Sequence, residues 1–592
     1  GANDGALHAF RLSDGVEQWA FFPKSMHPKL NMAGVDPLYD RCERDYCHRY
    51  FIDGTPVVGD VYADFGNSYD EWRSILVVGG REGSTAYFAL DVTSGNNFNH
   101  ATEPTKFLWE FTDSDLGETW SDPSIRRVAK EASTDKAWAV FFGSGYAEDD
   151  INQPSKTAYL YGLHAHDAGY LWKDKNGVPV NKIKMADGDG TGTLVYDNWM
   201  SSFYTIDQVG ETVTGASSGA TGTIVAVRVT IPNDSGEIDL ENVVGTFIDN
   251  EVITSSLPGG GQALANGDLS GNAPLLNDAL ASPLLVDMEA DFISDRIYIG
   301  NLYGDMHRVL DIGKNMTPQV TQLFTFNHTS PYINSIRGTA AFAYAHEKDH
   351  IWVYFGTGRF EHQTDKTNGA SQYLIGVKDW KDSAYDPVIP KPTYQLSDLV
   401  PLQAKYVTTS VMVEGVPVDK TFRIIEGDNP DNSPWAVELF AQQTDWGWNG
   451  PVPIGSERIL TKPLVIGGVV YFTTFVPDEN VCAGNGETWL LAVDFETGQV
   501  PDHAVFDING DGMFNDQDYV KVGEDAEGNP IMKPPAGLYV GRGQGSYPVY
   551  QDGHLFVTTT GSGDEDQDDG GLTATPINTD NIGVTLKSWK QN

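Results

Sequence analysis

The chain has 592 residues, of which 40% are hydrophobic, and this is enough for one large domain with insertions or for several domains. Its 82 acidic residues outnumber 39 basic ones, and the formal net charge of −43 repels nucleic acid and anionic membranes while favouring cations. No apolar run approaches the ~20 residues of a membrane-spanning helix. We therefore expect neither a nucleic-acid partner nor a membrane-spanning segment.

The cysteines and the first residues bear on the compartment. Three cysteines in so long a chain exclude a disulfide scaffold. Cys42 and Cys47 are predicted to bond to each other, because a lone Cys-x4-Cys pair is a weak zinc signal; Cys482 has no evident partner. The chain carries no signal peptide and begins inside a repeat motif, so we expect it to be part of a longer precursor.

One short pattern recurs along the chain: an aromatic and aliphatic strand, then a turn that ends in glycine. The copies are Gly5–Gly15, Thr85–Gly95, Ala158–Gly169, Gln372–Val377 and Thr488–Gly498, with a looser copy at Ile297–Arg308. The alternation is typical of a strand, and the Asp-x-x-x-Gly corner is typical of a hairpin.

A second type of strand lies between the copies. Its members are apolar throughout and several end in glycine: Ser74–Gly80, Trp138–Gly145, Ile351–Gly358 and Val469–Thr474. Such runs are predicted to be inner strands with both faces covered. Two strand types that alternate at this spacing indicate the blades of a β-propeller. We expect a last strand, His554–Thr560, to pair with the first repeat and close the ring, and we predict no long amphipathic helix.

A stretch rich in Gly, Thr, Ser and Asp, from about Asn181 to Asn277, breaks this rhythm. Within it, Val209–Gly215, Ala220–Val227 and Gly245–Thr254 have strand-like alternation. The predicted organisation is therefore a first set of blades over 1–180, an inserted small β module with a linker over 181–277, and the remaining blades over 278–592, with a calcium-binding loop inserted at 507–518.

The first acidic loop, Asp287–Asp295, joins two apolar strands. Asp287, Glu289, Asp291 and Asp295 occupy its positions one, three, five and nine. Alternate residues of a tight loop can point at one cation, and hard oxygen ligands suit calcium. The alternative is an acidic surface turn without an ion. We favour calcium, because the loop has no glycine and its charges repel one another without a cation.

The second acidic loop, Asp507–Asp518, is a fuller calcium signature. Its oxygen-bearing positions match those of an EF-hand loop, with a glycine at position six and aspartate in place of glutamate at position twelve. The expected ligands are Asp507, Asn509, Asp511, the backbone carbonyl of Met513, Asn515 and Asp518. The alternative is again an acidic loop without an ion. No flanking helix pair is predicted, so a structural clamp is favoured over a switch.

Other candidate chemistry is weaker. Asp187, Asp189 and Asp197 could converge on a third ion, although a plain loop fits them equally well. His164 and His166 alternate onto one strand face, but two histidines without a third ligand are more often edge residues than a metal site. The sequence has no phosphate-binding loop.

Several blocks resemble the propeller of PilY/PilC-type proteins, which are tip-associated adhesins and assembly factors of bacterial type IV pili. The blocks follow the family's order: Gly1–Phe10, His48–Val61, Trp120–Ser124, Gly338–Ala341 and Gly455–Pro477. The resemblance implies a modified seven-bladed propeller and a calcium loop that maps onto the first acidic loop. The chain departs from that family pattern at two positions. Glu289 stands where the pattern has aspartate, and Phe292 stands where glycine is usual.

The resemblance further implies a non-enzymatic function with Ca²⁺ as the bound ion. It implies a partner among the minor pilins or elsewhere at the pilus tip, a function in surface or host adhesion and in pilus extension and retraction, and an extracellular location reached through the periplasm. The alternative is a quinoprotein-like dehydrogenase that uses pyrroloquinoline quinone, since that class shares the motif Asp4–Phe10 followed by Trp19. Many of its members need an adjacent Cys-Cys pair, which this sequence lacks.

Overall fold

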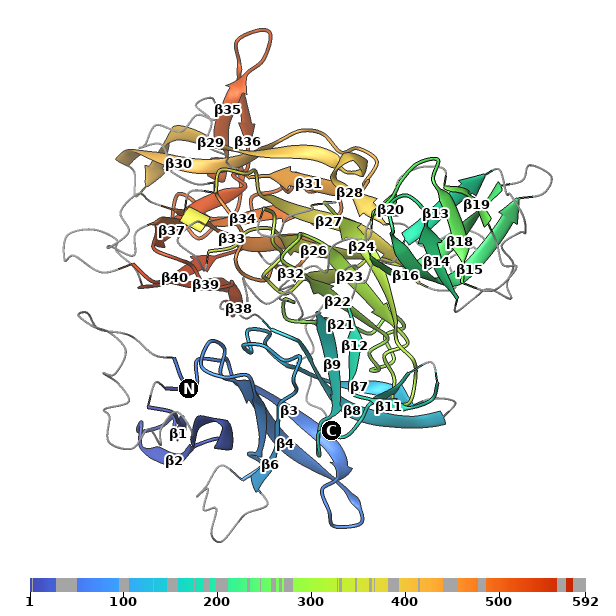
Figure 1. Ribbon diagram of the computed structural model, residues 1–592. Coiled ribbons are helices and arrows are strands. Elements are labelled where there is room, and N and C mark those ends of the chain that lie inside the picture. The colour runs from blue at the N-terminus through green and yellow to red at the C-terminus, as the bar shows by residue number, and fades with distance from the viewer. Residues whose placement is uncertain are drawn as a thin grey trace, which may run out of the picture.

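The computed structural model is built from β-strands, and its helical residues lie in short 3-10 turns such as η1 (Lys24–Met26), η7 (Leu396–Asp398) and η8 (Asp516–Asp518). The predicted all-β propeller is confirmed (Figure 1). The structure describes residues 1–2, 4–27, 50–94, 106–130, 133–145, 158–174, 176–185, 192–197, 211–230, 235–244, 246–256, 262–265, 269–270, 280–326, 328, 333–345, 349–360, 365–366, 368–381, 393–413, 416–439, 456–477, 486–561 and 571–578.

The first strands form one two-stranded unit and two four-stranded blades. The two-stranded unit is β1 (Leu7–Phe10) with β2 (Glu17–Phe21). One blade has the order β3 (Val57–Asp64), β4 (Asp70–Gly79), β5 (Tyr87–Asp91), β6 (Phe107–Phe111). The next has the order β7 (Ser124–Lys130), β8 (Ser133–Gly143), β9 (Tyr159–His164), β12 (Lys182–Lys184), with a small hairpin of β10 (Trp172–Lys173) and β11 (Pro179–Val180) beside it.

The later strands continue around the ring. One blade is β21 (Leu284–Val286), β22 (Arg296–Gly300), β23 (Met306–Leu310), β24 (Gln319–Thr325), with β28 (Tyr394–Gln395) at its edge. The next two are β25 (Ala341–Tyr344), β26 (His350–Gly356), β27 (Tyr373–Trp380), β31 (Trp435–Glu438), and β32 (Leu464–Ile466), β33 (Val469–Pro477), β34 (Gly486–Asp494), β37 (Gly537–Arg542). A long hairpin, β29 (Val400–Val413) and β30 (Val416–Glu426), joins them into one ten-stranded sheet.

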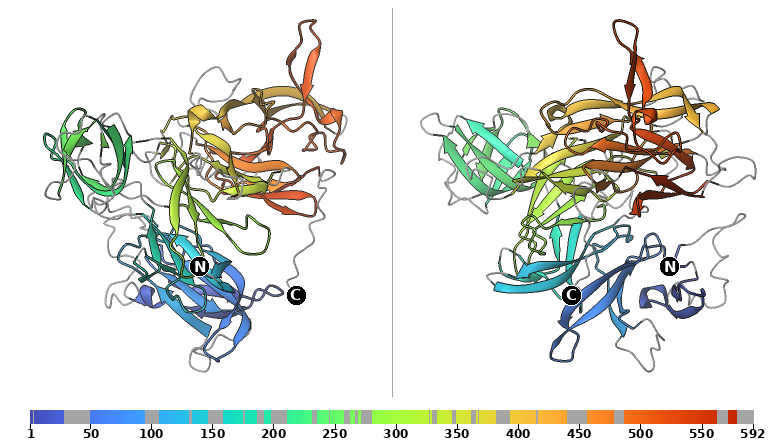
Figure 2. Two further views of the ribbon diagram at one scale, coloured as in Figure 1. Left: turned by 90° about the vertical axis from the view of Figure 1, so that its right-hand side faces the viewer. Right: turned by 180° about the vertical axis from the view of Figure 1, so that it is seen from behind.

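The last described unit is β38 (Val549–Gln551), β39 (His554–Thr559) and β40 (Gly571–Pro576). The expectation that His554–Thr560 pairs with the first repeat is wrong. Both edges of β39 are already occupied by β38 and β40, so it cannot also hydrogen-bond to β1. The first and last units nevertheless lie on the same side of the molecule (Figures 1 and 2).

The predicted inner strands are confirmed, and they explain where the core lies. All seven residues of β26 and all nine of β33 are buried, because each strand has neighbours on both edges and blades on both faces. Glycines let successive blades approach closely. A Cβ added at Gly356 would lie 2.2 Å from Ile459, and one at Gly143 would lie 2.5 Å from Leu280. The apolar clusters therefore form between blades, as a propeller requires.

The predicted inserted β module is a closed barrel beside the propeller (Figures 1 and 2). Its order is β13 (Gly192–Asp197), β16 (Ser235–Val244), β15 (Thr221–Thr230), β14 (Thr212–Gly215), β18 (Val252–Ser255), β19 (Gln262–Ala265), with β17 (Thr246–Phe247) paired to β20 (Leu269–Ser270). It has an apolar core of its own. Residues 182–184, placed in the module by the sequence, instead form β12 and complete a blade by pairing with β9.

A buried charge cluster ties two blades together. The carboxylate of Asp379, at the end of β27, accepts hydrogen bonds from Arg296 at 2.7 Å, Arg308 at 2.5 Å and the hydroxyl of Tyr298 at 2.5 Å. Both ion pairs are almost completely shielded from solvent. Because β22 and β23 donate to a carboxylate of the following blade, this cluster fixes the two blades against each other beside the first acidic loop.

Candidate metal sites

The first acidic loop connects β21 to β22 and is anchored by apolar side chains. Met288 and Ile293 are buried, whereas Glu289, Asp291 and Phe292 are exposed. The backbone N–H of Asp295 donates to the carbonyl of Val286 at 2.8 Å and closes the hairpin. The strands therefore fix both ends of the loop, and its acids are gathered over a short span of chain.

Backbone N–H groups of the loop converge on its carboxylates. Asp287 accepts from the N–H of Asp291 at 3.1 Å and of Phe292 at 2.6 Å, one to each carboxylate oxygen. Asp291 accepts from Ile293 at 3.0 Å, and Asp295 accepts from Met288 at 2.8 Å. These contacts wrap the backbone around Asp287 and tie three carboxylates to the N–H groups of the turn.

The loop touches the blades on both sides of its own. The N–H of Ser294 donates to the carbonyl of Arg127 in β7 at 2.9 Å. On the other side the hydroxyl of Tyr344, the last residue of β25, donates to the carbonyl of Asp287, and Lys381 lies 3.3 Å from Glu289. Tyr344 and Lys381 carry no motif that the sequence reveals, because they come close only when the blades assemble. The first acidic loop thus lies at a junction of three blades.

The electrostatics of this loop favour a cation. The pKa of Asp295 is raised to about 6, chiefly by burial and also by the neighbouring carboxylates of Asp287 and Asp291, against the lowering effect of the hydrogen bond from Met288. Burial, together with the charges of Asp287, Asp295 and Glu289, raises the pKa of Tyr344 to about 12. The carboxylates of this loop therefore repel one another, and a bound cation would reduce that repulsion.

The second acidic loop has the same hydrogen-bond plan, with glycine at the positions that turn the chain. Asp507 accepts from Gly510 at 2.7 Å and from Gly512 at 2.8 Å. Asp511 accepts from Met513 at 2.8 Å, and Asn509 accepts from Asp511 at 2.9 Å. Gly510 and Gly512 have φ of 79° and 75°, a conformation that glycine adopts without steric cost.

The end of the second loop is a buried acid. Asp518 accepts from the N–H of Ile508 at 2.9 Å and from that of Asn515 at 3.0 Å, and it is fully buried. Asn515 in turn caps η8 by accepting from Gln517 at 2.8 Å. Burial raises the pKa of Asp518, and the charge of Asp507 acts in the same direction. The loop leads directly into β35 (Val520–Glu524), which forms a projecting hairpin with β36 (Pro530–Lys533) (Figure 1).

Both loops present the ligand chemistry of a calcium site, although their acids are spread. Among the described residues, the set of three metal-ligating side chains whose ligand atoms lie within 4.8 Å of one another is His164, His166 and Asp167, not the acids of either loop. A calcium ion would have to draw the loop carboxylates together. Their oxygen chemistry fits the ion, and the calcium assignments for all ten predicted ligands stay predictions.

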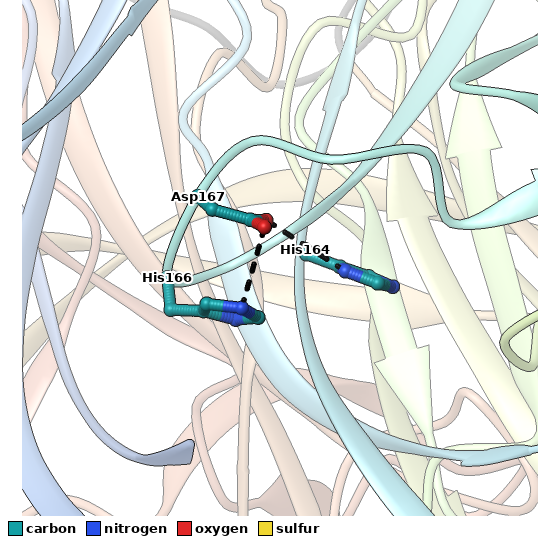
Figure 3. A group of neighbouring side chains, drawn as sticks. All are labelled: His164, His166 and Asp167. Atoms are coloured by element: carbon teal, nitrogen blue, oxygen red, sulfur yellow. Dashed lines mark ion pairs between the residues drawn. The ribbon is translucent and has the colours of Figure 1, made fainter. Parts of the chain in front are cut away.

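The sequence predicted only part of the cluster formed by His164, His166 and Asp167 (Figure 3). The sequence shows the two histidines, whereas Asp167 joins them because the chain turns back after β9. Burial lowers the pKa of His164 to about 4, and the charges of Lys314, His166 and Lys130 lower it against the opposing effect of Asp167. His164 is therefore a neutral imidazole near pH 7.

Three sequence predictions fall outside the described residues. Asp187 and Asp189 are not described, nor is the side chain of Asp197, so the possible third ion stays a prediction. The same holds for the proposed bond between Cys42 and Cys47, and for Cys482. In the described part of the chain, no helix has the length and apolar character needed to cross a membrane.

Comparison with known proteins gives a consistent result. Residues 1–198 match the family model described as the PilY1 beta-propeller domain. A Type IV pilus biogenesis factor PilY1 homolog of Xylella fastidiosa is 25% identical over 517 residues, covering 84% of this chain and 26% of that protein. The Type IV pilus biogenesis factor PilY1 of one Pseudomonas aeruginosa strain is 25% identical over 547 residues, covering 87% of this chain and 36% of that protein.

A solved structure resembles the whole chain. The crystal structure of the Pseudomonas aeruginosa PilY1 C-terminal domain has a TM-score of 0.56 and 18% identity, and the match covers 98% of this chain and 91% of that one. This likeness supports the propeller fold. The chain spans between a quarter and about a third of the length of the two curated relatives described above.

Proposed function

We propose that this PilY1-type chain is a calcium-binding, non-enzymatic component of type IV pili. In this proposal it is exported through the periplasm and acts at the pilus tip or outer cell surface, in contact with minor pilins. It contributes to pilus extension and retraction and to adhesion to surfaces or host cells. Its acidic charge suits a protein that binds cations outside the cell.

The pilus function is supported by the relatives, which are named as type IV pilus biogenesis factors. The match extends over most of this chain, so it does not depend on one shared blade motif. The names of these relatives describe biogenesis rather than a reaction, which supports the non-enzymatic assignment over a quinone-dependent dehydrogenase.

The observation that carries the calcium proposal is the position of the first acidic loop between three blades. Asp287, Asp291 and Asp295 would bind the ion through carboxylate oxygens, with Glu289 reaching from the outer side. Calcium, when bound, supplies positive charge and oxygen coordination that hold these acids together. The chain's own contacts, from Arg127 on one side and Tyr344 on the other, would then transmit order in the loop to the neighbouring blades.

The test is a substitution in the intact protein, expressed in the organism that encodes it. Asp291→Ala should reduce surface pili and pilus-driven motility while the amount of exported protein stays unchanged. Asp525→Ala is the matched control, because Asp525 is another exposed acid that accepts backbone N–H bonds in a turn, at 3.0 Å and 2.7 Å, but lies in neither loop. Normal piliation and motility in the Asp291→Ala strain would contradict the proposal.

The dehydrogenase alternative is tested on the same preparation. Dye-linked alcohol oxidation should stay at background when the purified protein is supplied with calcium and pyrroloquinoline quinone. Turnover under these conditions would replace the non-enzymatic assignment, whatever the outcome for the pili.

A further inference from the structure

A tight turn after β9 brings three metal-ligating side chains together. His164 is the last residue of β9, and its N–H donates to the carbonyl of Gly169 at 3.0 Å while its carbonyl accepts from Ala168 at 3.0 Å. Ala168 adopts a φ of 56°, which reverses the chain. Two backbone hydrogen bonds thus close the turn and hold His166 and Asp167 on the same side as His164 (Figure 3).

The distances within this cluster suit a small ion. Nδ1 of His164 lies 3.7 Å from Oδ1 of Asp167, and Nε2 of His166 lies 3.4 Å from Oδ2 of the same residue. The two imidazole rings are 5.6 Å apart and nearly parallel, with 19° between their planes. Ligands bound to zinc at ~2.1 Å in a tetrahedron are ~3.4 Å from one another. The cluster is therefore close to the required spacing before any ion binds.

Gly169 has no side chain, and this provides the space in which Asp167 and His164 approach each other. A Cβ at this position would lie 2.9 Å from Oδ1 of Asp167 and 3.3 Å from Nδ1 of His164, the two atoms that face each other. The N–H of Gly169 also donates to Oδ1 of Asp167 at 2.9 Å, which orients the carboxylate. His164 is only 9% exposed, so packing holds its imidazole with Nδ1 directed at Asp167.

We infer that His164, His166 and Asp167 form a binding site for a divalent transition-metal ion of the zinc class, separate from the two acidic loops. Two imidazole nitrogens with one carboxylate oxygen favour zinc, copper or nickel over calcium, which prefers oxygen ligands throughout. Three protein ligands leave a fourth position for water or for a ligand from another molecule. Access is open, because the side chains of His166 and Asp167 are 26% and 55% exposed.

Two lysines oppose this ion. Lys314 and Lys130 face His164 closely enough to act on it electrostatically, and Lys130 forms a backbone bridge with Lys314. Their positive charges weaken the binding of any cation to the cluster. Removing a lysine charge should therefore increase the affinity for the metal ion, whereas removing a ligand should decrease it.

The experiment is calorimetric titration of the intact chain with Zn²⁺ in excess calcium, which keeps the acidic loops saturated. We expect one zinc equivalent that His166→Ala removes. His503→Ala is the matched control, because His503 is 27% exposed and lies 2.7 Å from Asp502 in an exposed His–Asp pair outside the cluster. Loss of the equivalent in both variants, or in neither, would overturn the assignment.

Two further variants keep all three ligands. Gly169→Ala should weaken zinc binding roughly tenfold, the size expected for disturbing the support of a metal ligand. Lys314→Gln should strengthen it several-fold by removing an opposing charge. With Co²⁺ in place of zinc, His166→Ala should abolish the visible absorption of a tetrahedral site. An unchanged Co²⁺ spectrum in His166→Ala, or weaker zinc binding in Lys314→Gln, would contradict the site.

Discussion

The two acidic loops share one hydrogen-bond plan but have different residues at the positions that turn the chain. In each, the first aspartate accepts two backbone N–H bonds from residues three to five positions later, and the fifth residue accepts from the seventh. The last acid of each loop, Asp295 or Asp518, accepts the N–H of the second residue. The nine-residue loop therefore closes as the twelve-residue loop does, with three fewer residues.

The residue types differ at the positions that turn the chain. Positions four and six are left-handed in both loops. In the second they are Gly510 and Gly512, whereas in the first they are Ala290 and Phe292, with φ of 58° and 70°. A left-handed residue that carries a Cβ costs roughly 1–2 kcal/mol. The first loop holds this strain because the surrounding blades fix its ends.

The neighbours differ as well. The first loop contacts β7 and β25 of the flanking blades, whereas the second stands at the base of the projecting β35–β36 hairpin (Figure 1). The comparison teaches that similar ligand sets can serve different ends. Calcium at the first loop would couple blades, and calcium at the second would order a hairpin base.

The largest expected effect comes from the calcium-independent link beside the first loop. Asp379→Ala leaves the guanidinium groups of Arg296 and Arg308 buried without their carboxylate, which should cost about 3–5 kcal/mol of unfolding free energy. Denaturant unfolding should show this loss equally with calcium and with chelator. A loss seen only with calcium would mean that the loop and the charge cluster act as one unit, and the comparison would need revision.

The next effect is the pH dependence that Asp295 of the first loop contributes. The pKa of Asp295 is about 6 in the folded chain against an ordinary value of 3.8, so the folded form retains a proton that the unfolded form has released. In chelator, the stabilisation that Asp295 contributes should therefore be fully present below about pH 4. It should be lost as pH rises through 6, which lowers the unfolding free energy by about 1–2 kcal/mol after allowance for solvent screening.

Calcium should remove this fall, because it stabilises the deprotonated carboxylate. Asp295→Asn separates this contribution from that of Asp518, whose pKa is also raised by burial. Unfolding measured across pH 4 to 7 in chelator should show a smaller fall in the variant than in the wild type. An identical fall in both would assign the titration to another group.

The smallest effect comes from exchanging the residue types at the left-handed sixth position of the two loops. Phe292 is 58% exposed, so Phe292→Gly removes left-handed strain with little loss of packing and should increase calcium affinity about threefold. Gly512→Ala should cost about 1 kcal/mol through the backbone alone, since no atom lies within 4 Å of the added Cβ. Calcium titration of both variants tests whether strain distinguishes the loops. Equal affinity changes of the same sign would remove that distinction.

Much of the fold could be predicted, because strand periodicity depends on the local sequence. The inner strands β26 and β33 are apolar on both faces, and this pattern identifies them without any knowledge of their partners. Closure could not be predicted in the same way. His554–Thr559 has a strand sequence, but the choice between β1 and β38 as its neighbour is made by the β38–β39 turn and by packing.

The candidate sites also contain residues that local sequence identifies and residues that only the assembled fold brings together. The acids of both loops lie within short segments, so their spacing reveals them. Tyr344, Lys381 and Arg127 are distant in the sequence and reach the first loop only through the assembled ring. Asp167 is one residue from His166, yet its approach to His164 depends on the left-handed Ala168 and on the absence of a side chain at Gly169.

The central claim is that calcium at the first loop stabilises the junction of three blades, and thermal unfolding of three proteins with calcium and with chelator tests it most directly. A ligand that binds only the folded form stabilises by ~2.7 kcal/mol at a hundredfold excess over Kd. Wild type and Asp511→Ala should both gain melting temperature on adding calcium, and Asp291→Ala should lose most of that gain while matching the wild type in chelator. Equal calcium-dependent gains in wild type and Asp291→Ala would contradict the account.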